Sequence, residues 1–301
     1  MTVRETLEFG VVWLIVNVLK ALPRGLARWV GAGVAWVGYH ALGRLRKVGL
    51  KNLALAFPEQ SEAERQGILR KVYRNLGWQL AEFCHMPRYT AEEASRFIRY
   101  EGLENYLKAR DKGNGVLVLT GHLGAWELSS FYHSLMGYPM GMVIRRLDNP
   151  LVDAFVNHVR CLHGNRVIHK DDFARGLIAS MRAGETVGIL MDTNMTPPQG
   201  VFVPFFGVPA CTASGMARVA QKTGAAVVPG FLLWDERERR YVLRFGEEIE
   251  TADTGNAEED SVTNTARFTV VLEHYIREYP EQWLWMHRRW KTRPAGETGI
   301  Y

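Results

Sequence analysis

The sequence predicts an α/β fold, a mixed sheet flanked by helices, with a membrane-associated helical segment at its N-terminal end. At 301 residues, 47% hydrophobic and 23% charged, the chain has a globular composition and the length of one large α/β domain or two smaller ones. From residue 97 onward, short apolar runs alternate with helix-like segments, as in sheets covered by helices. Before them stand two apolar helix-like runs followed by a group of cations.

The N-terminal part holds the most apolar run of the chain, Leu7–Leu22, which three polar residues interrupt. It is short for a bilayer span, which takes about 20 apolar residues, and fits a marginal anchor or a helix lying in the interface. A second apolar run, 31–42, is followed by the cations Arg44, Arg46, Lys47 and Lys51. This order predicts membrane-associated helices over 1–48, with the charged side on the cytoplasmic face. A buried helical hairpin is the alternative.

A further helical segment is predicted over residues 49–96. Ser61 and Glu64 have the spacing of a capping box, so a helix is expected to begin there and to run to about Phe83. The rest of the chain, 97–301, is predicted to form the α/β core, and it ends in a segment rich in basic and aromatic residues.

The elements of the core are predicted from the length and periodicity of its apolar runs. Strands are expected at Val116–Thr120, Gly141–Ile144, Val187–Met191, Ala226–Trp234 and Tyr241–Phe245. Helices are expected near 125–136, 150–162, 173–182, 213–223 and 260–278. Residues 193–207, which are rich in Pro and Gly, are expected to form an irregular loop.

The turn after the strand at Val116–Thr120 carries a histidine. A helix-like run begins near Gly124–Glu127, so His122 lies in a strand-to-helix turn. Glu127 is within reach to fold back and hold the imidazole ring, and a histidine fixed by a carboxylate has the arrangement of a general base. The spacing alone is a weak signal, because a surface histidine near a glutamate at a helix N-terminus is common.

Other polar residues follow neighbouring predicted strands. Arg145 and Arg146 come directly after the second strand, and Asp192 comes after the third. Reactive residues gather at the carboxyl ends of parallel strands, so these side chains are expected to meet His122 at one edge of the sheet. Taken singly, Arg145 fits a surface cation and Asp192 a loop cap; their convergence favours a site.

The charge and composition of the chain limit the kinds of binding partner that are expected. A net charge of +5 suits nucleic acid, anionic lipid or phosphorylated substrates, and together with nine Trp it favours a membrane surface. No nucleic-acid-binding motif is recognisable, so no nucleic-acid partner is expected. Cys84, Cys161 and Cys211 are far apart and odd in number, which predicts neither a disulfide framework nor a zinc site and fits a reducing, cytosolic-facing location.

Seen together, a series of ordered motifs resembles the bacterial lipid A biosynthesis acyltransferase family. The motifs are GLKNLALAFP (49–58), GHLGAWE (121–127), IRRLDNP (144–150), LMDTN (190–194), VFVPFFGVPACT (201–212), TGAAVVPGF (223–231) and WLWMHRRWKTRP (283–294). The resemblance covers nearly the whole chain, and the last motif is the one least expected by chance.

The resemblance implies a glycerolipid acyltransferase-like fold with a single N-terminal membrane anchor and an active site on the cytoplasmic face of the inner membrane. It implies an enzyme that moves a fatty acyl group from an acyl-carrier-protein thioester to a hydroxyl of a lipid A precursor. A thioester is already activated, so no cofactor and no metal are expected. Residues 193–207 then fit a lip for the acyl chain; in the alternative, Phe205 and Phe206 are simple core residues.

Carried onto this chain, the family's motifs imply specific roles. His122 is the catalytic base and Glu127 its orienting partner. Arg145, followed by Asn149, matches the family's arginine motif, and Asp192 matches its aspartate after a strand. These last three residues are the substrate-binding candidates.

Three further positions qualify this picture. Arg175 is a weaker candidate for binding a phosphate of the acceptor. Thr193 stands where many members of the family carry Gln, and Ile144 stands where an aromatic residue is usual. These departures leave the expected chemistry intact and bear on the identity of the acceptor and of the acyl chain.

The C-terminal segment combines cations with tryptophans. Its members are Arg288, Arg289, Lys291, Arg293, Trp283, Trp285 and Trp290. Such a basic-aromatic cluster suits phosphates of a lipid acceptor, anionic head groups of membrane lipids, or an acidic carrier protein. The alternative is a packing motif with solvated charges, and His287 within it is expected to be structural.

Two other functions fit the same residues. One keeps the fold and the histidine but uses an acyl-CoA donor and another glycolipid acceptor, such as a phosphatidylinositol mannoside. The other is a non-catalytic membrane-binding protein, which the basic charge alone would permit.

Overall fold

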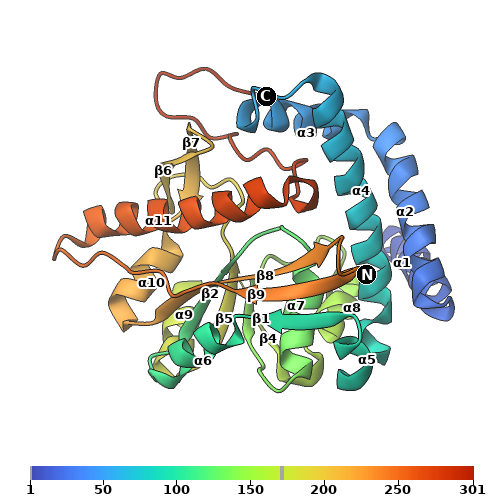
Figure 1. The fold of residues 1–301 in the computed structure, drawn as a ribbon, viewed down its shortest axis with the longest axis horizontal. Helices are drawn as coiled ribbons and strands as arrows, with labels where there is room; N and C mark the ends of the chain where they lie inside the picture. The colour runs from blue at the N-terminus through green and yellow to red at the C-terminus, as the bar shows by residue number, and fades with distance from the viewer. Residues whose placement is uncertain (1, 170–172) are drawn as a thin grey trace.

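The computed structural model describes residues 2–169 and 173–301 (Figure 1). In this part of the chain, a seven-stranded sheet has the order β1-β9-β8-β2-β5-β3-β4. Its strands are β1 (Ile98–Glu101), β2 (Val116–Thr120), β3 (Gly141–Ile144), β4 (Arg166–His169), β5 (Thr186–Leu190), β8 (Ala226–Asp235) and β9 (Arg240–Phe245). Neighbouring strands are parallel except β8 and β9, which are antiparallel. The predicted mixed sheet flanked by helices is confirmed.

Helices cover both faces of this sheet (Figure 1). They are α5 (Ala91–Ser95), α6 (Leu103–Asp111), α7 (Trp126–Leu135), α8 (Pro150–Arg160), α9 (Phe173–Arg182), α10 (Gly215–Thr223) and α11 (Ala257–Glu278). Along β2, Val116 and Val118 enter the core that contains α6 and α7, whereas Leu117 and Leu119 enter the core that contains α9, α10 and α11. A strand buried on both faces is a continuous apolar run, so the sequence predicts β2 and β3 with their observed bounds and β5, β8 and β9 to within one residue.

The two edge strands, β1 and β4, are absent from the sequence-based prediction. Each has one partner only, β9 for β1 and β3 for β4, and each is partly exposed. Their sequences, IRYE and RVIH, therefore carry charged residues and do not stand out as apolar runs.

The expectation of an irregular loop over 193–207 is wrong in its second half. Strand β6 (Gly200–Phe205) pairs antiparallel with β7 (Val208–Ala213), and the turn residues Phe206 and Gly207 have φ angles of 51° and 74°. Two positive φ angles in a two-residue hairpin turn match the right-handed twist of the strands. Phe205 and Phe206 are buried among aromatic side chains, so the alternative of simple core residues holds for both.

Four helices precede the core: α1 (Val3–Ala21), α2 (Arg24–Ala41), α3 (Gly43–Ala56) and α4 (Glu62–His85). The capping box of Ser61 and Glu64 begins α4, as predicted. α2 crosses α4 at Gly31 and Gly77, where a Cβ on either glycine would clash with the backbone of the other helix. This close contact fixes α2 to the helix that continues into the core.

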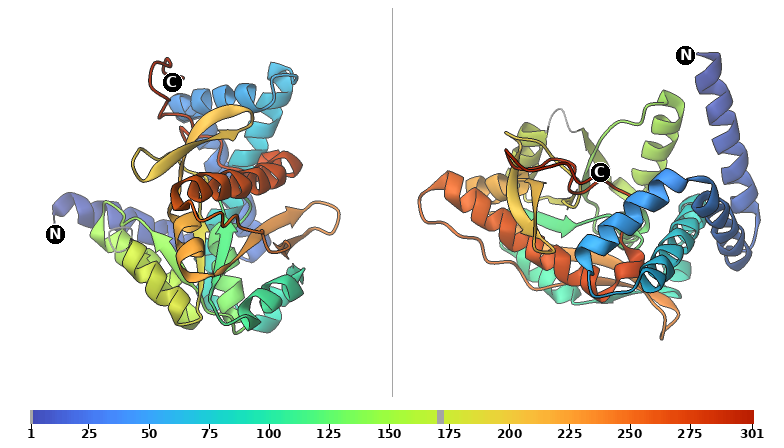
Figure 2. Two further views of the ribbon diagram at one scale, coloured as in Figure 1. Left: turned by 90° about the vertical axis from the view of Figure 1, so that its left-hand side faces the viewer. Right: turned by 90° about the horizontal axis from the view of Figure 1, so that it is seen from above.

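The outer surface of α1 and α2 is apolar. Trp29 and Trp36 are 75% and 63% exposed, and they are joined on these helices by Val3, Leu7, Val11, Trp13, Leu14, Ile15, Val18, Leu26, Val34 and Val37. Both views of Figure 2 place α1 at the edge of the molecule. The alternative of a fully buried hairpin therefore does not hold.

None of the helices within residues 2–169 and 173–301 is long and apolar enough to cross a membrane.

A buried carboxylate joins α4 to α2. Glu82 is fully buried and makes an ion pair with Arg24 at 2.6 Å, lies 3.8 Å from Arg28, and accepts a hydrogen bond from the Tyr89 hydroxyl. Removing a buried partner leaves unpaired charge inside the protein, so Glu82→Ala is expected to lower the free energy of unfolding by about 3–5 kcal/mol. Thermal or denaturant unfolding of the full chain measures it.

The matched control is Glu236→Ala, which removes the exposed partner of Arg74. It is expected to cost about 0–1 kcal/mol, because exposed ion pairs contribute little. Equal losses for the two variants would show that the Glu82 cluster does not hold α2 to α4.

Candidate active site

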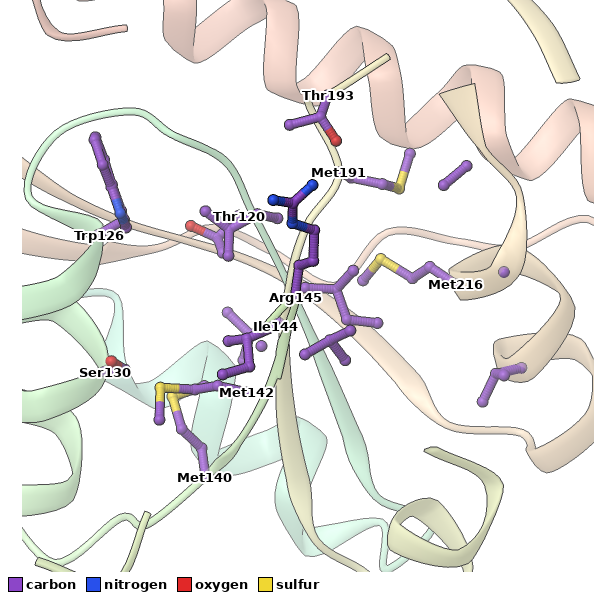
Figure 3. Close-up of a pocket in the computed structure, with 18 of the residues that line it drawn as sticks. Thr120, Trp126, Ser130, Met140, Met142, Ile144, Arg145, Met191, Thr193 and Met216 are labelled. Atoms are coloured by element: carbon purple, nitrogen blue, oxygen red, sulfur yellow. The ribbon is translucent and has the colours of Figure 1, made fainter. Parts of the chain in front are cut away.

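A cavity of about 750 Å³ opens at the carboxyl ends of β2, β3 and β5. Its wall is largely apolar. Figure 3 shows Met140, Met142, Ile144, Met191 and Met216 around it, and Arg145, Trp126, Thr120 and Thr193 line it as well. His122, Glu127 and Arg160 also line it. The cavity therefore joins a few polar groups to a space suited to an apolar chain.

The register of the sheet brings His122 to Asp192. β2 and β5 are parallel neighbours in which Thr120 lies opposite Leu190, and each of the two residues follows its strand end by two positions. Gly121 leaves the space between them open, since a Cβ there would lie 3.1 Å from Asp192 Oδ2. The expected meeting at one sheet edge is confirmed for His122 and Asp192, whereas Arg145 lines the cavity without contacting His122 and Arg146 is exposed outside its lining.

Asp192 holds the histidine at two points. His122 Nδ1 lies 2.9 Å from Asp192 Oδ1, and the backbone N–H of His122 donates to Oδ2 at 2.6 Å. The indole Nε1–H of Trp283 donates to the same Oδ2 at 2.8 Å. The carboxylate of Asp192 is 2% exposed. The sequence analysis expects this aspartate to bind substrate, whereas in the structure its carboxylate contacts His122 and Trp283.

This arrangement sets the charges of both groups. Burial raises the pKa of Asp192, but the positive field of His122 and three donated hydrogen bonds outweigh it and hold that pKa at about 2. Burial also disfavours the imidazolium, yet the attraction and hydrogen bond of Asp192, aided by the charge of Glu127, raise the pKa of His122 above its usual value. The pair is a carboxylate beside a histidine of increased basicity.

The second ring nitrogen of His122, Nε2, is not bound by Asp192. Nδ1 is occupied by an ionised carboxylate, which favours the tautomer with the proton on Nδ1 and the lone pair on Nε2. The His122 side chain is 27% exposed and lines the cavity, and no hydrogen bond among the described residues engages Nε2. Nε2 is therefore the atom that can accept a proton.

The expectation that Glu127 holds the ring of His122 is wrong. Glu127 is in the first turn of α7, where its carboxylate accepts two hydrogen bonds from Arg160 of α8, at 2.8 and 2.5 Å. The ring of His122 packs instead against Trp126, with 5.2 Å between ring centroids. Glu127 remains on the cavity wall and acts on His122 through its charge.

Arg160 is a site residue that sequence reasoning missed. It stands near the end of α8, 33 residues from its partner, where nothing in the sequence distinguishes it from a surface cation. Burial lowers the pKa of its guanidinium, but the hydrogen bonds and charge of Glu127 outweigh this and raise it.

Three other predicted residues have different surroundings. Arg145 lines the cavity opening, and its side chain is 75% exposed and, within the part of the chain that the structure describes, paired with Asp148 alone, at 2.9 Å. Asn149 caps α8 by accepting from Leu151 N–H and Val152 N–H. Its amide also donates to Glu5 O and Glu8 Oε2 of α1. Arg175 is exposed on α9, whereas its neighbours Ala174 and Ile178 line the cavity.

The C-terminal basic-aromatic segment is mainly a packing element. Trp283, Trp285, Trp290 and Arg289 are fully buried. Arg289 donates to Cys211 O and Thr212 Oγ1, and burial lowers its pKa to about 10. His287 accepts from the backbone N–H of Asn194 and is structural, as expected. Arg288 is half-buried and, with Arg44, Lys47 and Lys51, lines a separate hollow of about 460 Å³.

Among the described residues, no group of three His, Cys, Asp or Glu side chains is placed to hold a metal ion.

The chain is similar in sequence to known proteins over nearly its whole length. Residues 2–292 match the family described as bacterial lipid A biosynthesis acyltransferase. The chain is 29% identical to the lipid A biosynthesis lauroyltransferase of Escherichia coli K12, with 98% of this chain and 94% of the relative covered. It is 28% identical to the palmitoleoyltransferase of the same organism (97% and 92% covered) and 27% identical to its myristoyltransferase (85% and 78% covered).

The family model covers almost the whole chain, and the resemblance seen in the sequence is confirmed. The chain belongs to the bacterial lipid A biosynthesis acyltransferase family, and it is an acyltransferase of lipid A biosynthesis.

Proposed function

We propose that the enzyme transfers a fatty acyl group from an acyl-carrier-protein thioester to a hydroxyl of a lipid A precursor, with His122 as general base, at the cytoplasmic face of the inner membrane. The observation that carries the proposal is the His122–Asp192 pair, in which Nδ1 is bound to the carboxylate and Nε2 is left for a substrate, on a histidine that lines a cavity with an apolar wall. A base beside an apolar slot is what the transfer of an acyl chain to a hydroxyl requires.

The proton follows one path in this mechanism. His122 Nε2 takes the proton of the acceptor hydroxyl as its oxygen attacks the thioester carbonyl. The tetrahedral intermediate then collapses, the carbon–sulfur bond breaks, and the leaving thiolate takes the proton from the imidazolium. Asp192 stabilises that imidazolium through Nδ1. Glu127 stays a proposed catalytic group, because its charge helps to raise the pKa of His122 although it does not bind the ring.

Arg145 is the best candidate to receive the developing oxyanion. The backbone N–H groups of His122, Gly124 and Ala125 are already used, by Asp192, Gln282 and Leu232. Arg145 lies at the cavity opening, and its exposed pair with Asp148 is of a kind worth about 0–1 kcal/mol, so a substrate can recruit it readily. Arg218 and Lys222 of α10, which also line the cavity, suit an anionic donor.

The central test is an acyl-transfer assay with a tetra-acylated lipid A precursor and labelled acyl-carrier protein or acyl-CoA. His122→Ala is expected to lower kcat/KM by about 10²–10⁴ with the carrier-protein donor, because the base is lost. His274→Ala, an exposed histidine of α11, is the control. A His122→Ala enzyme with more than half its activity would falsify the base; transfer from acyl-CoA alone would overturn the donor.

The pH profile tests the carboxylate partner. Because the pKa of His122 is raised, the rate should climb with pH through a value above 6.5 as the imidazole loses its proton. Asp192→Asn removes the attraction that raises this pKa, so the acid limb should move to lower pH while the maximal rate falls. An acid limb at the same pH in both proteins would contradict the pairing.

The cavity wall provides a test of chain length. A Cβ added to Gly188 of β5 would lie 3.0 Å from Met140 Cε, the flexible end of a side chain on the same wall. Gly188→Ala should therefore favour shorter acyl chains, and Met140→Ala should favour longer ones. One methylene is worth about 0.8 kcal/mol, or about a fourfold change in preference.

The chain-length assay offers acyl donors of graded length in competition. Gly67→Ala, at an open position on α4, is the control and should leave the preference unchanged. If Gly188→Ala and Met140→Ala showed the same preference for acyl-chain length, the acyl chain would lie elsewhere.

The apolar surface of α1 and α2 supports membrane docking. Exposed aromatic and aliphatic residues, followed along the chain by the cations Arg44, Lys47 and Lys51 of α3, suit insertion at the boundary of an anionic leaflet. Trp29→Ser with Trp36→Ser should reduce sedimentation with vesicles of phosphatidylethanolamine and phosphatidylglycerol. Val270→Ser, which removes an equally exposed apolar residue of α11, is the control. Equal vesicle binding by all three proteins would rule out this surface.

A further inference from the structure

The turn that carries His122 is paired with a segment about 160 residues further along the chain. Gly124 N–H donates to Gln282 O at 3.0 Å, Leu284 N–H donates to His122 O at 3.0 Å, and Leu123 lies opposite Trp283 in an antiparallel bridge. The backbone on both sides of Trp283 is thereby fixed to the backbone on both sides of Leu123. The tryptophan is held within reach of the catalytic turn.

The same segment is anchored on its other side to the scaffold. Gln282 bonds the backbone of Trp234 in both directions, accepting from its N–H at 2.8 Å and donating to its carbonyl at 2.9 Å. The buried amide of Asn52, on α3, donates to Trp285 O and His287 O, each at 2.7 Å. Residues 282–287 therefore do not move independently of β8 and α3.

Asp192 Oδ2 accepts from two donors, the backbone N–H of His122 and the indole of Trp283. The other contact of the carboxylate, between Oδ1 and His122 Nδ1, also comes from His122, so Trp283 is the donor from a second segment that restricts the otherwise broad terminal torsion of the aspartate. Trp283 is itself 1% exposed and packs edge-on against Trp285, with 4.5 Å between ring centroids, and against Phe205. Its N–H is a fixed donor.

We propose that Trp283 is a positioning residue of the active site, whose indole N–H fixes the plane of the Asp192 carboxylate so that Oδ1 faces His122 Nδ1. Trp283 has this role in catalysis only if His122 is the base, as proposed above. Its effect on the His122–Asp192 pair, in contrast, can be measured without any turnover.

The test compares Trp283→Phe with Trp285→Phe in the full chain. Both variants shorten a buried indole and remove one N–H, but the N–H of Trp285 goes to Pro280 O, away from the carboxylate. Trp283→3-benzothienylalanine keeps the shape of the indole and removes only its N–H, which separates lost hydrogen bonding from lost packing. NMR titration of the His122 ring and the pH profile of kcat/KM are the two readouts.

The carboxylate of the Trp283 variants is held by His122 alone and its plane is less restricted, so its average attraction to the imidazolium weakens. The pKa of His122 should fall toward its ordinary value, the acid limb should move to lower pH, and kcat should drop about ten- to a hundredfold. Trp285→Phe should leave the His122 pKa and the acid limb in place. In an Asp192→Asn background, Trp283→Phe should cost no further activity, because both changes act on one contact.

Three results would overturn the proposal. An unchanged His122 pKa in the benzothienyl variant would show that the indole N–H does not orient the carboxylate. A raised His122 pKa would show that the indole N–H only withdraws charge from the Asp192 carboxylate. Fully additive losses with Asp192→Asn would place its effect elsewhere. If His122→Ala stays active while Trp283→Phe shifts the His122 pKa, the general-base role fails and the positioning contact stands.

Discussion

One buried carboxylate is the constraint on which the site depends. Asp192 is removed from water, so its charge has to be balanced within the protein, and His122 together with Trp283 does this. The contact raises the basicity of the histidine and fixes which nitrogen is free. The fold supplies what this requires: two adjacent parallel strands that end in register, a glycine between the two side chains, and a C-terminal segment that closes over them.

The two ends of the molecule serve this centre in different ways. The C-terminal residues 283–290 contribute their tryptophans and Arg289 to the core beside the catalytic turn. These buried side chains are therefore not part of an exposed basic-aromatic surface. The N-terminal helices leave their apolar residues exposed, and α1 reaches the start of α8 through Asn149. Since α8 also carries Arg160, the proposed membrane surface and the cavity wall are joined by one helix.

The sequence predicts the buried strands because burial on both faces leaves a continuous apolar run, and it predicts His122 and Asp192 at one sheet edge because both follow such strands. It does not reveal that β2 and β5 are neighbours, since strand order comes from tertiary packing. Glu127, closer along the chain, was therefore the natural partner to expect. Arg160 carries no local pattern, Trp283 stands in a C-terminal motif that does not reveal its contact with Asp192, and the edge strands β1 and β4 are too polar to be recognised.

The most direct test of the central claim is the protonation state of the His122 ring nitrogens in the unmodified enzyme, measured by ¹⁵N NMR in detergent across a pH series. The account predicts a neutral form with its proton on Nδ1, facing Asp192, and a bare Nε2, formed with a pKa above 6.5. A neutral form protonated on Nε2 would contradict it, because that nitrogen could not then accept the proton of a hydroxyl. A pKa below 6.5 would contradict it too, because Asp192 would then not raise the basicity of the ring.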